Sequence, residues 1–259
     1  MENLNVTLIQ TDLHWEDKAA NLALFDKKLS QLHQPTDLIL LPEMFTTGFS
    51  MDAPALAETM SGKTLHWLQE KAAAFNAVIT GTCIIEEAGL YFNRLIWMRP
   101  DGSFETYDKR HLFALAKEHH TYTAGNQQLL VDLKGWKIMP LICYDLRFPV
   151  WSRNAAGYDL LLYLANFPER RNHAWKSLLI ARAIENQAYT IGLNRVGTDG
   201  KEVYHAGDSA VIDYAGQVLY QCSHIENMYT AALSYTKQQA FREQFAFLND
   251  RDDFEIIFS

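Results

Sequence analysis

Short apolar runs alternate with amphipathic segments along most of the chain. The runs are rich in β-branched and aromatic residues and are bounded by turn residues, the pattern of strands. A turn at 100–102 separates two of them, which indicates a hairpin. Strands are expected at residues 6–10, 37–41, 78–85, 91–98, 104–107, 137–142, 159–164, 188–194, 208–213, 217–222 and 228–234.

Longer stretches with a helical repeat of apolar positions lie between these strands. They predict helices at about 17–33, 63–76, 149–156, 169–187 and 236–246. Strand and helix alternate early, while hairpin-like pairs gather later, which is typical of a layered α/β protein with mixed sheets. Without a linker, a low-complexity segment or a clear repeat, the chain is expected to form one domain over residues 1–259.

Two of the predicted strands, 37–41 and 137–142, are almost entirely apolar, as expected for strands covered on both faces. Ligands of open α/β sheets bind beyond the carboxyl ends of such strands. Glu43 follows the first strand and Cys143 follows the second. These two ends are therefore the first place to look for chemistry.

The charge of the chain narrows the classes of partner. A formal net charge of −8 argues against a nucleic-acid or anionic-membrane surface, since both need a basic stripe.

The sequence also indicates the compartment. No apolar run approaches the ~18 residues of a membrane span, and residues 2–10 are typical of a strand rather than of a signal peptide. Three widely spaced cysteines match neither a disulfide framework nor a zinc site. A cytoplasmic protein is expected.

Cys143 has two interpretations. Buried free cysteines are common and usually inert. Here, however, a strand ends and Asp145, Arg147 and Pro149 follow at once, so a sharp turn would present the thiol and nearby backbone N–H groups to a substrate. Cys83 and Cys222 lack such surroundings, and we interpret both as structural.

A nucleophilic thiol needs a base. Nine histidines are available, and spacing alone selects none, so a Cys/His pair stays open. The alternative is a carboxylate helped by a cation. Glu43, among apolar neighbours, is either half of a structural ion pair or a general base with a pKa raised by burial. Lys109 is either a surface lysine or the cation that stabilises a thiolate and an oxyanion.

Three segments in this order resemble the nitrilase (carbon–nitrogen hydrolase) superfamily. They are LPE, which ends at Glu43, YDKRHLF, which contains Lys109, and ICYDLRF, which contains Cys143. The likeness continues through ANFP (165–168), ARAIENQAY (181–189) and GDSAVID (207–213), and it spans residues 4 to about 235.

The resemblance implies a four-layer α-β-β-α sandwich with two mixed sheets, assembled as a homodimer or a larger homo-oligomer. It also implies a Glu43–Lys109–Cys143 triad, with Glu118 as the second glutamate of the family. The backbone N–H of Tyr144 would share the oxyanion with Lys109. The reaction would release ammonia from an amide through a thioester, and it requires no metal and no organic cofactor.

The segment CYDLRFP (143–149) looks more like ω-amidases and deaminated-glutathione amidases than like carbamoylases. The resemblance favours ω-amidase, acting on 2-oxoglutaramate or 2-oxosuccinamate. Such a small substrate is an anion, and Arg147 is the candidate for binding its carboxylate. An ion pair with Asp145, or a backbone clamp behind the nucleophile, is the alternative role of Arg147. Hydrolysis of a nitrile is the alternative reaction.

Other interpretations are weaker. A non-catalytic ligand-binding protein on the same fold would have little reason to keep all three triad residues. A thiol-redox role is disfavoured because no resolving cysteine lies near Cys143 in the sequence. Arg182 and Glu185 lie one turn apart, which predicts an internal salt bridge. His119 and His120 are expected in a loop beside Glu118 rather than on a metal. Trp151 and Trp175 are candidates for an oligomer face.

Overall fold

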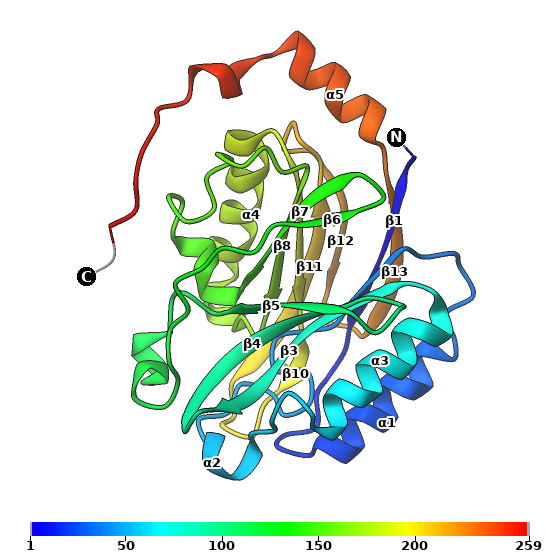
Figure 1. The fold of residues 1–259 in the computed structure, drawn as a ribbon, viewed down its shortest axis with the longest axis vertical. Coiled ribbons are helices and arrows are strands. Elements are labelled where there is room, and N and C mark those ends of the chain that lie inside the picture. The colour runs from blue at the N-terminus through cyan, green and yellow to red at the C-terminus, as the bar shows by residue number, and fades with distance from the viewer. Residues whose placement is uncertain (1, 258–259) are drawn as a thin grey trace.

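The computed structural model describes residues 2–257 and contains two mixed β-sheets (Figure 1). The first has the strand order β13-β1-β2-β3-β4-β5, with parallel pairing at β1–β2 and β2–β3 and antiparallel pairing elsewhere. Its strands are β1 (Leu4–Gln10), β2 (Leu38–Leu40), β3 (Val78–Glu87), β4 (Leu90–Met98), β5 (Phe104–Asp108) and β13 (Asn227–Leu233).

The second sheet has the order β10-β11-β9-β8-β7-β6, and β12 also pairs with β11. The pairs β7–β8 and β8–β9 are parallel, and the other pairs are antiparallel. Its strands are β6 (Val131–Leu133), β7 (Trp136–Ile142), β8 (Leu160–Ala165), β9 (Tyr189–Asn194), β10 (Val196–Thr198), β11 (Tyr204–Ile212) and β12 (Val218–Ser223).

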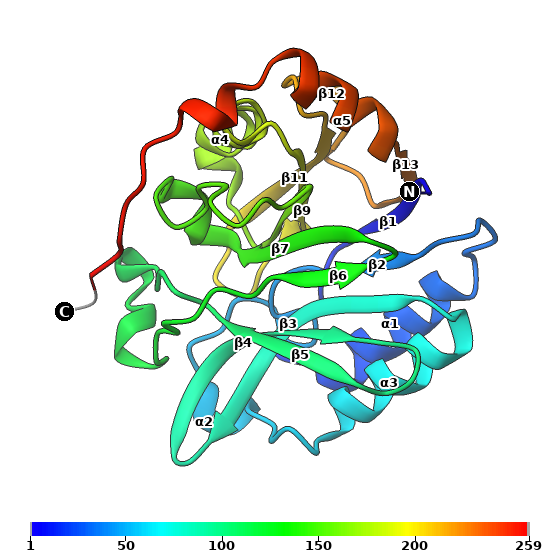
Figure 2. The same ribbon diagram turned by 45° about the horizontal axis from the view of Figure 1, so that its top comes forward.

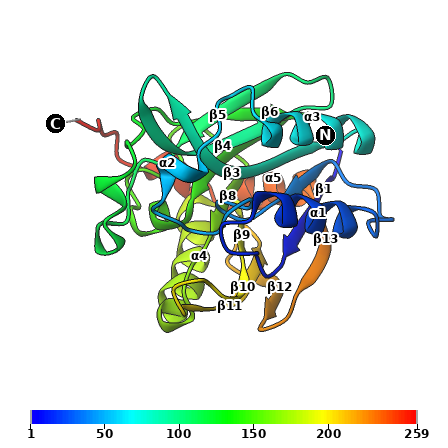
Figure 3. The same cartoon turned by 90° about the horizontal axis from the view of Figure 1, so that it is seen from below.

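Helices cover the outer faces of the two sheets. Figure 2 shows α1 and α3 on one side of the molecule and α4 on the other, with both sheets between them, and Figure 3 shows the same separation from below. The four-layer α-β-β-α sandwich is confirmed. The helices are α1 (Lys18–Leu29), α2 (Ala53–Leu56), α3 (Lys63–Phe75), α4 (Asn172–Asn186) and α5 (Tyr235–Gln244).

The strand β2 explains why apolar runs are continuous in this fold. Leu38 and Leu40 belong to the large core that includes strands of the other sheet, whereas Ile39 packs in the core beneath α1 with Phe25 and Leu29. Alternate side chains of a strand point to opposite faces, so a strand with a core on each side must be apolar at every position.

Most predicted elements are confirmed, with ends shifted by a few residues. The helix expected at 149–156 is wrong: that segment forms turns, and a 3₁₀ turn precedes it at Cys143–Arg147. Further 3₁₀ turns lie at Ala114–Ala116, Glu118–His120, Glu169–Arg171 and Phe247–Asp250. The strands β6 and β10 and the helix α2 were not predicted.

The prediction that Trp151 and Trp175 line an oligomer face is wrong. Both are buried within the protomer, at 3% and 0% exposure.

Candidate active site

The candidate site lies where strands of both sheets end. Glu43 follows β2 and Lys109 follows β5 in the first sheet, while Cys143 follows β7 in the second. Asn166 follows β8, the strand that pairs in parallel with β7. The face-to-face packing of the sheets therefore brings together side chains that are far apart in the sequence.

Glu43, Lys109 and Glu118 form a buried ionic network, and all three side chains have zero exposure. The Nζ of Lys109 donates to Oε1 of Glu43 at 2.8 Å and to both carboxylate oxygens of Glu118 at 3.0 Å. The other carboxylate oxygen of Glu43 accepts from the backbone nitrogen of Asn166 at 2.8 Å. The ammonium group is therefore shared between two carboxylates.

Asn93 supports this network from β4. Its Nδ2 donates to Glu43 at 2.9 Å and approaches Glu118 at 3.4 Å, while its Oδ1 accepts from Thr82 at 2.7 Å. The Thr82 hydroxyl in turn accepts from the backbone nitrogen of Met44 at 2.7 Å. Each of these buried polar groups has a partner, which fixes the orientation of the Glu43 carboxylate.

Glu118 reaches the network through a loop that closes against Lys109. The backbone nitrogen of Gly125 donates to the carbonyl of Lys109 at 3.0 Å, and a Cβ at Gly125 would lie 2.2 Å from the carbonyl oxygen of Asp108. Only glycine permits this approach. Between the two ends of the loop, the backbone nitrogen of Phe113 donates to Glu118.

The electrostatics keep Lys109 charged. Burial opposes the charge, but the carboxylates of Glu118 and Glu43 outweigh burial and raise the pKa of Lys109 above its ordinary value. For Glu118, burial and the nearby Glu43 raise the pKa, and Lys109 opposes the rise. The network therefore combines one permanent cation with a carboxylate that holds a proton more readily than usual.

Cys143 occupies the first position of the turn after β7. Its φ of +43° lies in the left-handed region, where a non-glycine residue is held only if the surroundings impose it. The side chain is 9% exposed, and burial followed by the negative charge of Glu43 raises the pKa of the thiol well above its ordinary value. A thiol in this state needs a base before it attacks, and the carboxylate of Glu43 is the charge that acts on its pKa most strongly.

Asp145 holds this turn against the segment that carries Lys109. Its Oδ2 accepts from the Tyr107 hydroxyl at 2.7 Å and from the backbone nitrogen of Ile142 at 3.0 Å, and Oδ1 accepts from the backbone nitrogen of His111 at 3.0 Å. The suggested Asp145–Arg147 ion pair is therefore wrong, because Tyr107 and His111 occupy the carboxylate.

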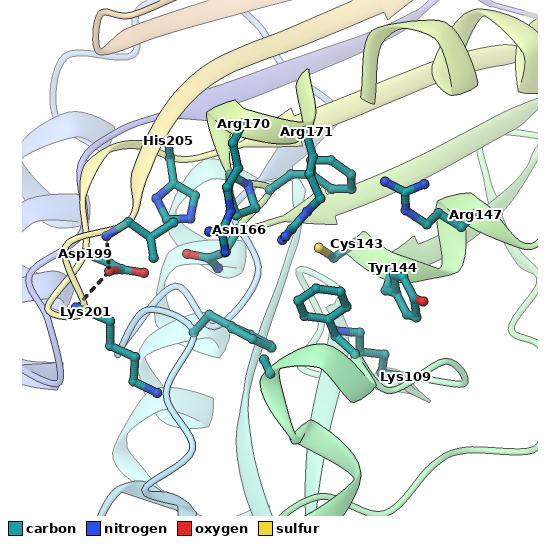
Figure 4. A pocket seen from close by; sticks show the side chains of 16 residues that line it. Lys109, Cys143, Tyr144, Arg147, Asn166, Arg170, Arg171, Asp199, Lys201 and His205 are labelled. Atoms are coloured by element: carbon teal, nitrogen blue, oxygen red, sulfur yellow. Dashed lines mark hydrogen bonds between the residues drawn. The ribbon is translucent and has the colours of Figure 1, made fainter. Parts of the chain in front are cut away.

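The thiol opens into a pocket whose volume is about 110 Å³. Lys109, Tyr144 and Arg147 line it together with Cys143 (Figure 4). The backbone clamp behind the nucleophile is made by a different arginine: Arg182 donates to the carbonyl of Leu146 at 2.6 Å and also forms the predicted salt bridge with Glu185. Arg147 itself remains in the pocket.

Three features of the described residues concern metal sites, disulfides and membrane-spanning helices. Among residues 2–257, no group of three histidine, cysteine, aspartate or glutamate side chains is arranged to hold a metal ion, and His119 and His120 are exposed. The three cysteines are free. No helix in the same range has the length and apolar character required to cross a membrane.

The sequence model of the family described as Carbon-nitrogen hydrolase matches residues 5–243. The chain belongs to the carbon–nitrogen hydrolase family. It is 44% identical to the omega-amidase YafV of Escherichia coli K12, covering 99% of this chain and all of that protein. It is 30% identical to the 2-oxoglutaramate amidase of Bacillus subtilis 168, covering 95% of this chain and 96% of that protein.

The solved structure of XC1258 from Xanthomonas campestris, a CN-hydrolase superfamily protein, superposes with a TM-score of 0.97. It is 42% identical, and the match covers 99% of this chain and all of that one. The expected resemblance to carbon–nitrogen hydrolases, and to ω-amidases among them, is confirmed.

Sequence reasoning missed several residues around the site of this carbon–nitrogen hydrolase. Asn93 lies inside a strand with no distinguishing neighbours, so nothing marked it. Asn166 directly follows the apolar strand β8, as Cys143 follows β7, and the same rule of strand ends would have selected it. Arg171, in the run of two arginines that follows, also lines the pocket.

Proposed function

We propose that the protein is an ω-amidase that hydrolyses the terminal amide of a short 2-oxo acid, 2-oxoglutaramate or 2-oxosuccinamate. The observation that carries the proposal is the buried Glu43–Lys109–Glu118 network beside the Cys143 thiol, in a pocket that also holds arginine side chains. The E. coli and B. subtilis relatives with omega-amidase and 2-oxoglutaramate amidase names support this substrate class.

The first half of the reaction forms a thioester. Glu43 takes the proton of the Cys143 thiol, and the sulfur attacks the amide carbon, so a C–S bond forms and the carbonyl π electrons move to oxygen. When the tetrahedral intermediate collapses, the C–N bond breaks. Glu43 returns the proton to the leaving nitrogen, which departs as ammonia.

The oxyanion of that intermediate is stabilised by Lys109 and the backbone N–H of Tyr144. Lys109 is suited to this because two carboxylates hold its ammonium group in place before the substrate arrives. Removing one donor of such a site typically costs about 3–4 kcal/mol of transition-state stabilisation.

The second half consumes water. Glu43 takes a proton from a water molecule, the oxygen attacks the thioester carbon, and the C–S bond breaks as the tetrahedral intermediate collapses. The proton returns to the sulfur of Cys143 and the carboxylic acid leaves. Glu118 positions Lys109 and the amide nitrogen during acylation. These steps need neither a metal nor an organic cofactor.

Arg147 is proposed to bind the substrate carboxylate. It lines the pocket, lies over the Phe167 ring at 5.8 Å, and makes no hydrogen bond or ion pair with the described residues. An unpaired guanidinium beside the thiol fits a substrate that carries a carboxylate better than a neutral one. Nitrile hydrolysis and deaminated-glutathione amidase activity remain alternative outcomes of the assay below.

We further propose that the enzyme acts in the cytoplasm as a homodimer or a larger homo-oligomer. The three free cysteines suit a reducing compartment. Light scattering of the purified protein measures the oligomer, and a monomer would contradict this part of the proposal.

The decisive experiment measures ammonia release from 2-oxoglutaramate by the wild type and by Cys143→Ala, beside the nitrile with the same acyl chain. We expect turnover of the amide by the wild type alone. Turnover of only the nitrile would overturn the amidase proposal. No turnover of 2-oxoglutaramate by the wild type would overturn the substrate, and equal turnover by both proteins would remove Cys143 from the reaction.

A further inference from the structure

Arg171 is a second arginine beside the nucleophile. It ends the 3₁₀ turn at Glu169–Arg171, immediately before α4, and its side chain is half-buried. The guanidinium lies over the Phe113 ring at 4.6 Å and over the Phe167 ring at 5.8 Å. Figure 4 shows it pointing toward Cys143, with Arg147 on the other side of the sulfur.

Phe167 connects the two arginines. The same ring lies 5.8 Å from the guanidinium carbon of Arg147 and 5.8 Å from that of Arg171. Aromatic faces attract guanidinium groups but leave their N–H donors free for a ligand. Both arginines are therefore held in place with their hydrogen-bonding capacity unused.

Neither of these arginines has a carboxylate partner among the described residues. Five other arginines of the fold do pair with acidic residues: Arg94, Arg99, Arg182, Arg195 and Arg242. Within residues 2–257, Arg171 forms neither an ion pair nor a hydrogen bond through its side chain. A half-buried charge without a partner is costly unless a ligand supplies one.

The neighbouring charges increase this cost. Burial lowers the pKa of Arg171, and the positive charges of Arg170 and Arg147 lower it further, while the negative form of Cys143 acts in the opposite direction. An anion bound at this point would offset the repulsion among the guanidinium groups. The chain as a whole carries a net charge of −8, so this concentration of positive charge is local to the pocket.

We infer that Arg171 is a specificity-determining residue that binds the substrate carboxylate together with Arg147. Both guanidinium groups lie 5.8 Å from the Phe167 ring. The inference rests on the proposed amidase function and deepens it. The enzyme would then select amides that carry a carboxylate over neutral amides of the same length, although both present the same reacting group.

The first test compares 2-oxoglutaramate with 4-oxopentanamide, in which a methyl group replaces the carboxylate. For Arg171→Gln we expect kcat/KM on 2-oxoglutaramate to fall roughly 30-fold, mainly through KM, because a charged partner is lost. The neutral amide should change less than about threefold. Arg171→Lys should restore part of the preference, since it keeps the charge but not the planar fork.

Arg170→Gln is the matched control, because it removes the same charge from a neighbour in the same turn that also lines the pocket but is exposed. It should retain the preference for the carboxylate. An equal loss on both amides in Arg171→Gln, no loss on either, or the same change of preference in Arg170→Gln would each overturn the assignment.

The second test does not depend on turnover. Iodoacetate and iodoacetamide alkylate a thiol by the same displacement of iodide, but only iodoacetate is an anion. We expect the ratio of their rates at Cys143, followed by mass spectrometry, to fall about tenfold in Arg171→Gln and to hold in Arg170→Gln. An unchanged ratio overturns the anion site even if the enzyme is an ω-amidase. A lowered ratio supports it even if 2-oxoglutaramate is not hydrolysed.

Discussion

Asp145 binds His111 twice, through the backbone nitrogen at 3.0 Å and through ring Nδ1 at 2.8 Å, both to the same carboxylate oxygen. The other oxygen binds Tyr107 and the backbone nitrogen of Ile142. Tyr107 and His111 flank Lys109, and Ile142 precedes Cys143. One carboxylate therefore links the segment that carries Lys109 to the turn that begins at Cys143.

Replacing Asp145 by Asn should impair positioning, because an amide offers one acceptor oxygen to four donors. We expect kcat to fall 10- to 100-fold with little change in KM, and the free energy of unfolding to fall by roughly 2–3 kcal/mol. Steady-state kinetics and urea unfolding measure the two effects. Asp101→Asn, an exposed change of the same chemistry, is the control. A lowered stability with wild-type kcat would reduce Asp145 to a purely structural role.

Replacing Lys109 by Met should leave two buried carboxylates facing each other without a cation. We expect a loss of about 3–5 kcal/mol in folding stability and a fall in kcat of at least about 100-fold. Adding Glu118→Gln removes one of the stranded charges. The double variant should recover part of the stability but none of the activity, as urea unfolding and ammonia release would show. Recovery of kcat in the double variant would contradict the oxyanion role of Lys109.

Cysteine variants should separate chemistry from packing. Cys143→Ala is expected to abolish turnover and change the free energy of unfolding by less than about 1 kcal/mol. Cys83 lies in the core beneath α1, with 3% exposure. Cys83→Ala should lower stability by roughly 1–2 kcal/mol and keep kcat, because it leaves a small cavity on the face of β3 opposite to Thr82, the residue of that strand that belongs to the network. Loss of kcat in the folded Cys83 variant would argue against this division.

His205 should contribute a pH dependence to stability. Burial, with the nearby charge of Arg195, lowers the pKa of His205 to about 4 from its ordinary 6.5. The unfolded chain therefore binds a proton in this range that the folded chain does not. The contribution of His205 to stability is complete above pH 6.5 and declines as pH falls toward 4, by about 3 kcal/mol in total.

The measurement is urea unfolding of the wild type and of His205→Gln between pH 4 and 7. The difference between their free energies of unfolding should change with pH only in this window, since other titrating groups are common to both proteins. A difference that does not vary with pH would show that His205 has an ordinary pKa.

The sequence by itself specified most of the strands and the chemical types of Glu43, Lys109 and Cys143. It also placed Glu43 and Cys143 just beyond the ends of apolar strands. These properties are local: an apolar run predicts a buried strand, and the next residues must emerge at its end. The helix expected at 149–156 failed because tertiary contacts hold this segment instead of a helical hydrogen-bond pattern. Asn154 binds Asn186 and the carbonyl of Tyr158, and Gln128 donates to the carbonyl of Trp151.

Only the tertiary structure decided which of these groups meet. Asn166 binds Glu43 across 123 residues of sequence, and Asn93 touches both glutamates from within a strand. Among the described residues, Arg147 and Arg171 have no acidic partner. The tertiary structure decides this, because an acidic partner could come from any part of the chain. Such relationships arise when two sheets pack face to face, and the free energy of that packing belongs to the whole core rather than to any short segment.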